Sequence, residues 1–273
     1  MAQKSGVLDH VVFVRKRKVE GKSIKIPVYP NLQCGISEPW MINLLRNVMP
    51  HREGAFIDIG ANLGQTLVKV QAVAPEIQYV GFEPNPICVF YLWELIKLNE
   101  WHNCTIVPAG LYPENKILNL ECIGDKDADS GASIIHNFRS NRQITKTIPV
   151  PVLNYQSIQN TLEIGPVGFI KIDVEGAELD VVETLRPLIE KNKPILLVEI
   201  LPVHKAENIE RKKRQEELLR ILKSLKYKVF RIQKKNGEFF ELVPINDIGI
   251  HGDLDLCDYI MVPCEISDSF MPE

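Results

Sequence analysis

Short apolar runs alternate with helical segments along most of this chain. The runs lack a polar face, which is typical of strands buried on both sides of a parallel sheet. The segments between them carry apolar residues at helical spacing. Such alternation predicts βαβ units, an α/β fold and helices on both faces of the sheet. In the first half of the pattern the predicted strands are residues 55–59, 79–82 and 105–107, and the predicted helices are residues 65–74 and 86–99.

The same alternation continues toward the C-terminus. A strand at residues 169–173 precedes a helix that extends to about Leu185, and another buried strand follows at residues 195–200. A later helix is predicted from apolar residues that recur at helical spacing, namely Leu218, Ile221, Leu222 and Leu225. Residues 227–232 and 258–262 are predicted to be closing strands.

Two segments depart from this pattern. Residues 109–152 contain β-like runs at 117–122 and 147–152 without a helical period between them, so we predict an inserted β-meander. Residues 1–50 precede the alternation, and they include a short helix predicted to start at Ser37-Glu38-Pro39 and to continue to Val48. We therefore expect an N-terminal cap or extension (1–50) on a main unit (51–273), together forming one globular domain.

Composition narrows the class of protein. The 273 residues are 45% hydrophobic and 25% charged, which is ordinary for a globular chain. A net charge of -3 argues against a nucleic-acid partner. Two basic runs remain, and we interpret residues 15–18 as a loop or edge strand and residues 211–214 as the solvated face of a helix.

Cysteine usage and hydropathy predict where the protein resides. The six cysteines form no C-x-x-C pair, so we expect reduced thiols. The longest apolar run, residues 194–203, contains Glu199 and is shorter than the roughly 20 residues that a membrane span requires. No N-terminal signal is recognised. These features predict a soluble, cytoplasmic protein without a membrane span.

A glycine loop follows the first buried strand. Residues 58–64 read D-I-G-A-N-L-G and precede a helix, which is where open α/β sheets bind cofactors. A dinucleotide fingerprint would have glycines where this chain has Asn62 and Gln65. An Asn62 side chain would obstruct a pyrophosphate, whereas S-adenosylmethionine has no phosphate and presents a carboxylate and an ammonium group. Asp58, close to the loop, is a candidate electrostatic or water-mediated partner for that ammonium.

Two further acidic positions follow strands. Glu83 ends the second strand, where a carboxylate can accept hydrogen bonds from both ribose hydroxyls in dehydrogenases and methyltransferases alike. Asp173 and Glu175 follow the strand at 169–173, and they face the same side if the strand stays extended. They could hold a substrate hydroxyl, receive its proton or bind the methionine end of the cofactor. Alternatively, one of them caps the next helix.

Five motifs occur in order and together resemble the FkbM family of S-adenosylmethionine-dependent methyltransferases. They are D-x-G-A-N-x-G, F-E-P-N, G-A-S-I, I-K-I-D-V-E-G-A-E and L-V-E-I, and they span about residues 54–201. The resemblance implies a Rossmann-like fold with a seven-stranded, mostly parallel sheet whose last strand is antiparallel. It also implies S-adenosyl-L-methionine as cofactor and O-methylation, in many members of a hydroxyl on a sugar, glycan or secondary metabolite.

The resemblance assigns roles to matching positions. Asp58, Gly60, Asn62 and Gly64 would line the methionine end of the cofactor, Glu83 would bind its ribose, and Asp173 with Glu175 would face the reactive centre. Residues 131–133 match a segment near the crevice. Residues 1–50 and 203–273 carry little that is diagnostic, which leaves the small-molecule acceptor open.

The chemistry of methyl transfer adds a candidate base. An aliphatic hydroxyl is a weak acid, so the protein must remove its proton, and Asp173, Glu175, Glu199 and His204 are the candidates. Methyltransferases that act on the amino groups of bases usually carry Asn or Asp, two prolines and an aromatic residue after the fourth strand, and this chain does not. No ligand spacing calls for a metal. The alternatives are an NAD(P)-dependent oxidoreductase and a non-catalytic binding protein on a methyltransferase fold.

Overall fold

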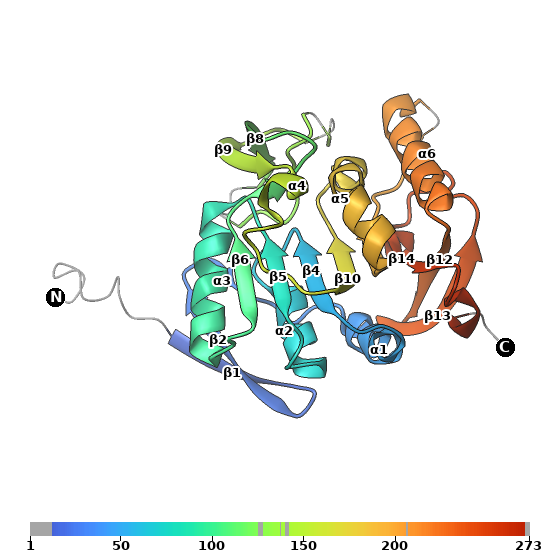
Figure 1. Ribbon diagram of the computed structural model, residues 1–273. Coiled ribbons are helices and arrows are strands. Elements are labelled where there is room, and N and C mark those ends of the chain that lie inside the picture. The colour runs from blue at the N-terminus through green and yellow to red at the C-terminus, as the bar shows by residue number, and fades with distance from the viewer. Residues whose placement is uncertain (1–12, 125–127, 137, 140–141, 206, 271–273) are drawn as a thin grey trace.

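The central sheet of the computed structural model has eight strands (Figure 1). The structure describes residues 13–124, 128–136, 138–139, 142–205 and 207–270. In spatial order the strands are β13 (Glu238–Ile245), β12 (Tyr227–Lys235), β14 (Asp258–Pro263), β11 (Ile195–Glu199), β10 (Val167–Ile172), β4 (Ala55–Ile59), β5 (Tyr79–Phe82) and β6 (Cys104–Val107). The five strands from β11 to β6 pair in parallel, whereas β14 runs antiparallel to both of its neighbours. The predicted mostly parallel sheet with an antiparallel last strand is confirmed.

The eighth strand, β13, was missed by the sequence analysis. It forms a hairpin with β12 at the edge of the sheet, and most of its side chains are exposed or half-buried, so it lacks an apolar run. The turn consists of Asn236 and Gly237, both with positive φ (54° and 79°). An Asn-Gly pair between strands is a strong hairpin signal, so the information was present in the sequence.

Helices cover both faces of the sheet, as predicted (Figure 1). One apolar cluster joins α1 (Pro39–Val48), α2 (Gln65–Val73) and α3 (Pro86–Asn99) to the sheet, through residues such as Leu44, Leu67 and Leu92. A second cluster joins α5 (Glu178–Asn192) and α6 (Ile209–Ser224) to the opposite face, through Leu185 and Leu222. None of the helices in the described ranges is long and apolar enough to cross a membrane.

The insertion forms a small mixed sheet rather than a meander. Its strands β7 (Gly110–Leu111), β8 (Lys116–Cys122) and β9 (Lys146–Leu153) lie in the order β7-β9-β8. A meander pairs consecutive strands antiparallel, but here β9 lies between the other two and runs parallel to β7. A long connection follows β8, and β9 then takes the central position between β7 and β8. Helix α4 (Tyr155–Ile158) follows, and the whole insertion lies beyond the carboxyl ends of the central strands (Figure 1).

The N-terminal segment packs against α3. It forms an antiparallel sheet of β1 (Phe13–Val19), β2 (Lys22–Tyr29) and β3 (Leu32–Gln33), in which β1 is an edge strand that contains the basic residues 15–18. Ile24 and Ile26 of β2 belong to the same apolar cluster as α3. The buried Tyr91 hydroxyl donates to Pro27 O at 2.7 Å and accepts a hydrogen bond from Cys34 N at 2.7 Å. Short 3-10 turns also occur at Met49–His51, Leu254–Leu256 and Ser267–Phe270.

Candidate functional site

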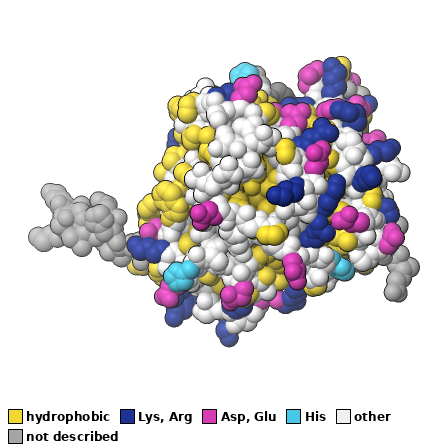
Figure 2. Space-filling model, viewed as in Figure 1, with side chains coloured by type: hydrophobic (Ala, Val, Ile, Leu, Met, Phe, Trp, Pro, Cys, Tyr) yellow, Lys and Arg dark blue, Asp and Glu magenta, His cyan; other side chains and the backbone are white. Residues whose placement is uncertain are grey.

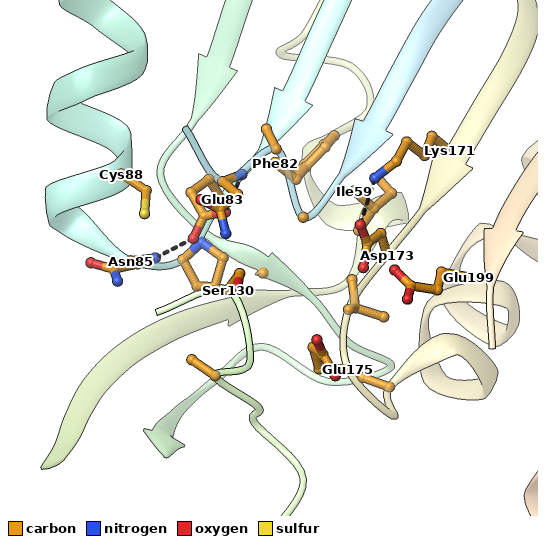
Figure 3. Close-up of a pocket in the computed structure, with 18 of the residues that line it drawn as sticks. Ile59, Phe82, Glu83, Asn85, Cys88, Ser130, Lys171, Asp173, Glu175 and Glu199 are labelled. Carbon is orange, nitrogen blue, oxygen red and sulfur yellow. Dashed lines mark hydrogen bonds and ion pairs between the residues drawn. The ribbon is translucent and has the colours of Figure 1, made fainter. Parts of the chain in front are cut away.

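A cavity of about 460 Å³ opens at the carboxyl ends of β4, β5, β10 and β11 (Figure 3). The loop after β4 and the end of β5 form one wall, and carboxylates that follow β10 and β11 form the opposite wall. The insertion and the start of α1 complete the rim. Its polar lining includes Ser37, Glu38, Asn62, Gln65, Glu83, Asn85, Asp129, Ser130, Lys171, Asp173, Glu175 and Glu199. This position agrees with the general rule for ligand sites in open α/β sheets.

The glycine loop touches the β10 end so closely that a side chain is excluded. Gly60 has φ +85°, and a Cβ atom there would lie 1.9 Å from Asp173 O. Asn62, also in the left-handed region, lines the cavity, and its Oδ1 atom is buried without a hydrogen-bond partner among the described residues. Gly64 has φ +87° and faces Leu92 and Leu95 of α3 instead, outside the cavity lining. Its part is therefore to let α2 start close against α3.

Glu83 is held by backbone amides. Its Oε1 accepts from Asn85 N at 2.8 Å and its Oε2 accepts from Asn62 N at 2.7 Å. Burial raises the pKa of Glu83 to about 7, while the two backbone hydrogen bonds oppose that rise. Each carboxylate oxygen can still accept another hydrogen bond, so this group can receive two donors from a ligand in the cavity.

Asp58 lies behind the cavity rather than in its wall. The carboxylate is fully buried, accepts a hydrogen bond from the Tyr79 hydroxyl at Oδ2 and has Oδ1 3.8 Å from Lys171 Nζ. Burial raises the pKa of Asp58, and the Lys171 charge opposes the rise. Lys171, which lines the cavity, thus lies next to Asp58, whose Oδ1 atom is buried without a hydrogen-bond partner among the described residues.

Three ionisable groups, Lys171, Asp173 and Glu199, meet on the opposite wall (Figure 3). Lys171 Nζ donates to Asp173 Oδ2 at 2.9 Å, and Asp173 also shares a hydrogen bond with Glu199. Burial would raise the pKa of Asp173, but the Lys171 ammonium and these hydrogen bonds outweigh it and hold the pKa below its usual range. The Asp173 charge, followed by burial, raises the pKa of Glu199, so Glu199 keeps its proton near neutral pH.

Glu175 reaches the cavity through a turn. The strand ends at Ile172 and Glu175 has φ 52°, so the condition of an extended strand through Glu175 is not met, although Asp173 and Glu175 do line the same cavity. The capping alternative is also wrong, because the N-cap of α5 is Ala177 and has no side-chain hydrogen bond. Burial raises the pKa of Glu175 to about 7, and the Arg139 guanidinium, which donates to Oε2, opposes that rise.

The insertion and α6 together hold the Glu175 turn. Ser133 Oγ donates to Glu175 O at 2.6 Å, and the Phe138 ring packs where a Cβ atom of Gly176 would lie, 2.4 Å away. Arg211 of α6 lies over that ring, 4.1 Å from its centroid, and donates to Phe138 O. Ser133 belongs to the G-A-S-I motif, which the sequence analysis placed near the crevice without a definite role.

The basic run at residues 211–214 divides into two pairs. Lys212 and Lys213 are exposed, as predicted for a solvated face. Arg211 and Arg214 are half-buried and donate to backbone carbonyls, Arg214 to Gly176 O at 3.1 Å, so the prediction is wrong for them. Guanidinium groups carry several donors on one plane, which suits them to bridging elements.

His204 lies apart from the other predicted residues. Its side chain is exposed and is not among the described residues that line the cavity. Conversely, Lys171, Arg139 and Glu38 were not selected from the sequence. Lys171 carried a signal, since a lysine within a strand buried on both faces needs a charged partner. Arg139 carried none, because its contact with Glu175 joins positions distant in the chain.

The comparisons identify similar proteins. A model of the methyltransferase FkbM domain matches residues 58–232, which include most of the cavity lining. No curated protein matches the sequence. Similar crystal structures include a methyltransferase FkbM from Methylobacillus flagellatus, with 16% identity, a TM-score of 0.47, and coverage of 77% of this chain and 43% of that one. The present chain therefore spans less than half the length of that protein.

Two further structures have cofactor molecules bound. Fibrillarin from Aeropyrum pernix, in complex with S-adenosyl-L-methionine, has 12% identity and a TM-score of 0.46, and the match covers 91% of this chain and 81% of that one. The methyltransferase PaMTH1 from Podospora anserina, with S-adenosylhomocysteine bound, has 11% identity and a TM-score of 0.42, with 82% and 76% covered. Because all three TM-scores are below 0.5, the family assignment rests on the match to the domain model.

Proposed function

This chain belongs to the FkbM methyltransferase family, and on that premise we propose that it transfers a methyl group from S-adenosyl-L-methionine to a hydroxyl oxygen of a small acceptor such as a sugar, glycan or secondary metabolite. One observation carries the proposal. The cavity has Glu83, held by the backbone amides of Asn62 and Asn85, on one wall, and Glu175, whose pKa burial raises to about 7, on the other.

The cavity residues fit the cofactor. The unpartnered Asn62 Oδ1 needs a hydrogen-bond donor, and an amino acid ammonium group is one. Glu83 would accept hydrogen bonds from both ribose hydroxyls. Asn62 stands at the second glycine position of the dinucleotide fingerprint, where a side chain would obstruct a pyrophosphate, and this favours a phosphate-free cofactor. Bound there, S-adenosyl-L-methionine supplies a methyl group that its sulfonium already makes electrophilic.

Asp173 would act as a fixed negative charge in this arrangement. Lys171 and Glu199 lower its affinity for a proton, so it remains ionised at neutral pH and is a poor base. An ionised carboxylate beside the glycine loop attracts an ammonium group. Lys171, itself backed by Asp58, keeps Asp173 in position.

Glu175 would be the general base. A base works best when its pKa lies near the working pH, and among the candidates Glu175 meets that condition. Arg139 holds Oε2, which leaves Oε1 to take the proton of the acceptor hydroxyl. Glu199 is protonated and His204 is exposed outside the cavity, so the proposal assigns neither of them this role.

Two measurements test the proposal. Thermal shift compares S-adenosylhomocysteine with NADH, and we expect stabilisation by the former alone, because a nicotinamide dinucleotide would clash with Asn62. Transfer of radiolabelled methyl groups from S-adenosyl-L-methionine is then measured against panels of sugars, glycans and metabolites, with the position of the label determined by mass spectrometry. Stabilisation by NADH alone, or label found only on nitrogen, would contradict the proposal.

A further inference from the structure

The solvent face of α3 is apolar. Ile87, Phe90 and Trp93 recur every third residue and expose 36%, 46% and 51% of their surface. A surface helix normally turns polar residues to the solvent once its other face is packed, and α3 already packs Val89, Leu92 and Leu95 into the core. Figure 2 shows hydrophobic side chains gathered along the edge of the molecule where α3 lies.

The apolar surface continues from α3 onto the N-terminal sheet. The Tyr29 ring of β2 lies 5.6 Å from the Phe90 ring. Across the hairpin, Phe13 of β1 pairs with Val28 and is 69% exposed. Val14, the next residue of β1, is also exposed. The contact between Tyr29 and Phe90 therefore links α3 to the N-terminal sheet, and Phe13 and Val14 lie on the free edge strand of that sheet.

A run of cationic side chains adjoins this patch. Arg15, Lys16, Arg17 and Lys18 continue β1 directly from Val14, and all of them are exposed. Arg15 and Arg17 share the strand face of Phe13, whereas Lys16 and Lys18 share that of Val14, so the cations flank the free edge of β1 on both sides. Within the described part of the chain none of the four makes an ion pair. By contrast, Arg46 is bound by Glu20 at the end of the same hairpin. The single acid on the exposed face of α3, Glu94, lies 3.9 Å from Lys97.

We propose that the exposed side of α3 (Ile87, Phe90 and Trp93) and the free edge strand β1 (Phe13, Val14 and the basic residues 15–18) together dock on an anionic lipid surface. Apolar side chains beside unpaired cations are the combination that binds at a bilayer interface, because the former enter the boundary of the acyl chains and the latter attract acidic headgroups. Trp93 is the residue type favoured at that depth. A nucleic acid would use the cations but would leave the aliphatic side chains uncovered. The inference does not depend on the proposed methyl transfer.

Vesicle sedimentation tests the proposal on the full chain. Vesicles of phosphatidylcholine alone are compared with vesicles that also contain phosphatidylserine, at low and at high salt. We expect binding only to the anionic vesicles, weakened by salt because charges at a surface are screened. Replacing residues 15–18 with serine removes four cations and should weaken binding at least about ten-fold. Replacing Phe90 and Trp93 with serine should also weaken it at least about ten-fold.

Matched variants control for charge and apolar surface elsewhere. Lys212→Ser with Lys213→Ser removes exposed cations from α6, and Phe240→Ser removes a residue of β13 that is 56% exposed. Both should bind vesicles like the parent chain, and circular dichroism and thermal unfolding check that every variant folds. Because the substituted residues of β1 are all exposed, the strand variant tests the idea even if the helix variant unfolds.

Four outcomes would overturn the proposal. The first is that the parent chain does not bind anionic vesicles at low salt, and the second is that the control variants lose binding as much as the test variants do. The third is that the chain binds a labelled oligonucleotide but not vesicles. The fourth is that the parent chain is a dimer that Trp93→Ser converts to a monomer. The last would show that a second copy of the chain covers the face.

Discussion

Single carboxylates in this cavity differ in protonation because their immediate partners differ. Asp173 faces an ammonium group, Glu199 faces Asp173, and Glu175 faces a guanidinium group while it is buried. The same chemical group is thus an ion, an acid and a candidate base within one cavity. Residue type alone did not separate these roles, since the sequence offered Asp173, Glu175 and Glu199 as equivalent candidates.

Glu83→Gln should weaken S-adenosylhomocysteine binding about 10- to 100-fold, because two charge-assisted hydrogen bonds to the ribose become weaker and one oxygen becomes a donor. Isothermal titration calorimetry measures the change. Glu76→Gln, an identical substitution at an exposed position, should bind normally. Equal affinity in the parent and Glu83→Gln would remove Glu83 from the ribose site.

Glu175 should appear in the pH dependence of methyl transfer. A base acts when it is deprotonated, so kcat/KM should rise with pH through about 7, the pKa of Glu175, and then level off. Glu175→Gln should lower kcat by about 100- to 10,000-fold and abolish this limb. A limb that persists in Glu175→Gln would assign the base to another residue.

At the scale of elements, loops from distant parts of the chain build the reactive wall. The insertion supplies Ser133, Phe138 and Arg139 to the Glu175 turn, and α6 supplies Arg211 behind Phe138. The turn includes two residues with positive φ, Glu175 and Gly176, and Gly176 N donates to Glu178 Oε1 of α5 at 2.7 Å. Its shape therefore depends on α5 as well as on the insertion and α6, which pack on it.

Arg139→Gln tests whether the insertion tunes the base. Loss of the guanidinium removes the charge that holds the Glu175 pKa down, so the pKa should rise and the acidic limb of kcat/KM should move to higher pH. Arg139→Lys keeps the positive charge, so the acidic limb of kcat/KM should move less than in Arg139→Gln. Arg142→Gln, an exposed position in the same insertion, is the control. A lower rate with an unmoved limb would indicate a purely structural effect.

Gly60→Ala tests the contact between the ends of β4 and β10. The added Cβ would meet a backbone oxygen, Asp173 O, so we expect a loss of at least about 2 kcal/mol in the free energy of unfolding. Gly21→Ala separates strain from contact, because Gly21 also has a positive φ (+74°) but open space around it. Denaturant unfolding of both variants gives the difference. Equal losses would show that only backbone strain is involved.

At the scale of the whole molecule, the N-terminal segment and the central sheet share one apolar cluster. Ile24 and Ile26 pack with residues of α3 in that cluster, and Tyr91 bonds to the backbone at Pro27 and Cys34. Both ends of this link are buried. The segment predicted as a cap or extension is thus packed like core, and we expect it to unfold together with the sheet.

Tyr91→Phe measures this coupling. The substitution leaves Cys34 N buried without its acceptor, so the free energy of unfolding should fall by about 1–3 kcal/mol in a single transition. Tyr29→Phe is the matched control, since the described structure shows no hydrogen bond at the Tyr29 hydroxyl. Urea unfolding followed by fluorescence and by circular dichroism reports the change. A separate early transition would mean that the N-terminal segment unfolds on its own.

The sequence by itself determined the α/β class and the seven strands that it predicted in the central sheet. Buried strands are recognisable in the sequence as apolar runs. The motifs at their ends place Gly60, Asn62 and Glu83 in the cavity wall. The family follows from the same motifs. These features are local, so a pattern of a few residues is enough to reveal them.

Only the tertiary structure decided the strand pairing in the insertion, the buried position of Asp58 and the different protonation states of the carboxylates. Each depends on a contact between positions distant in the chain, such as Arg139 with Glu175 or Lys171 with Asp58. The pKa of a carboxylate is set by burial and by neighbouring charges, and neither is written in its own segment. The sequence shows which ionisable groups are present, and the fold determines which of them are protonated.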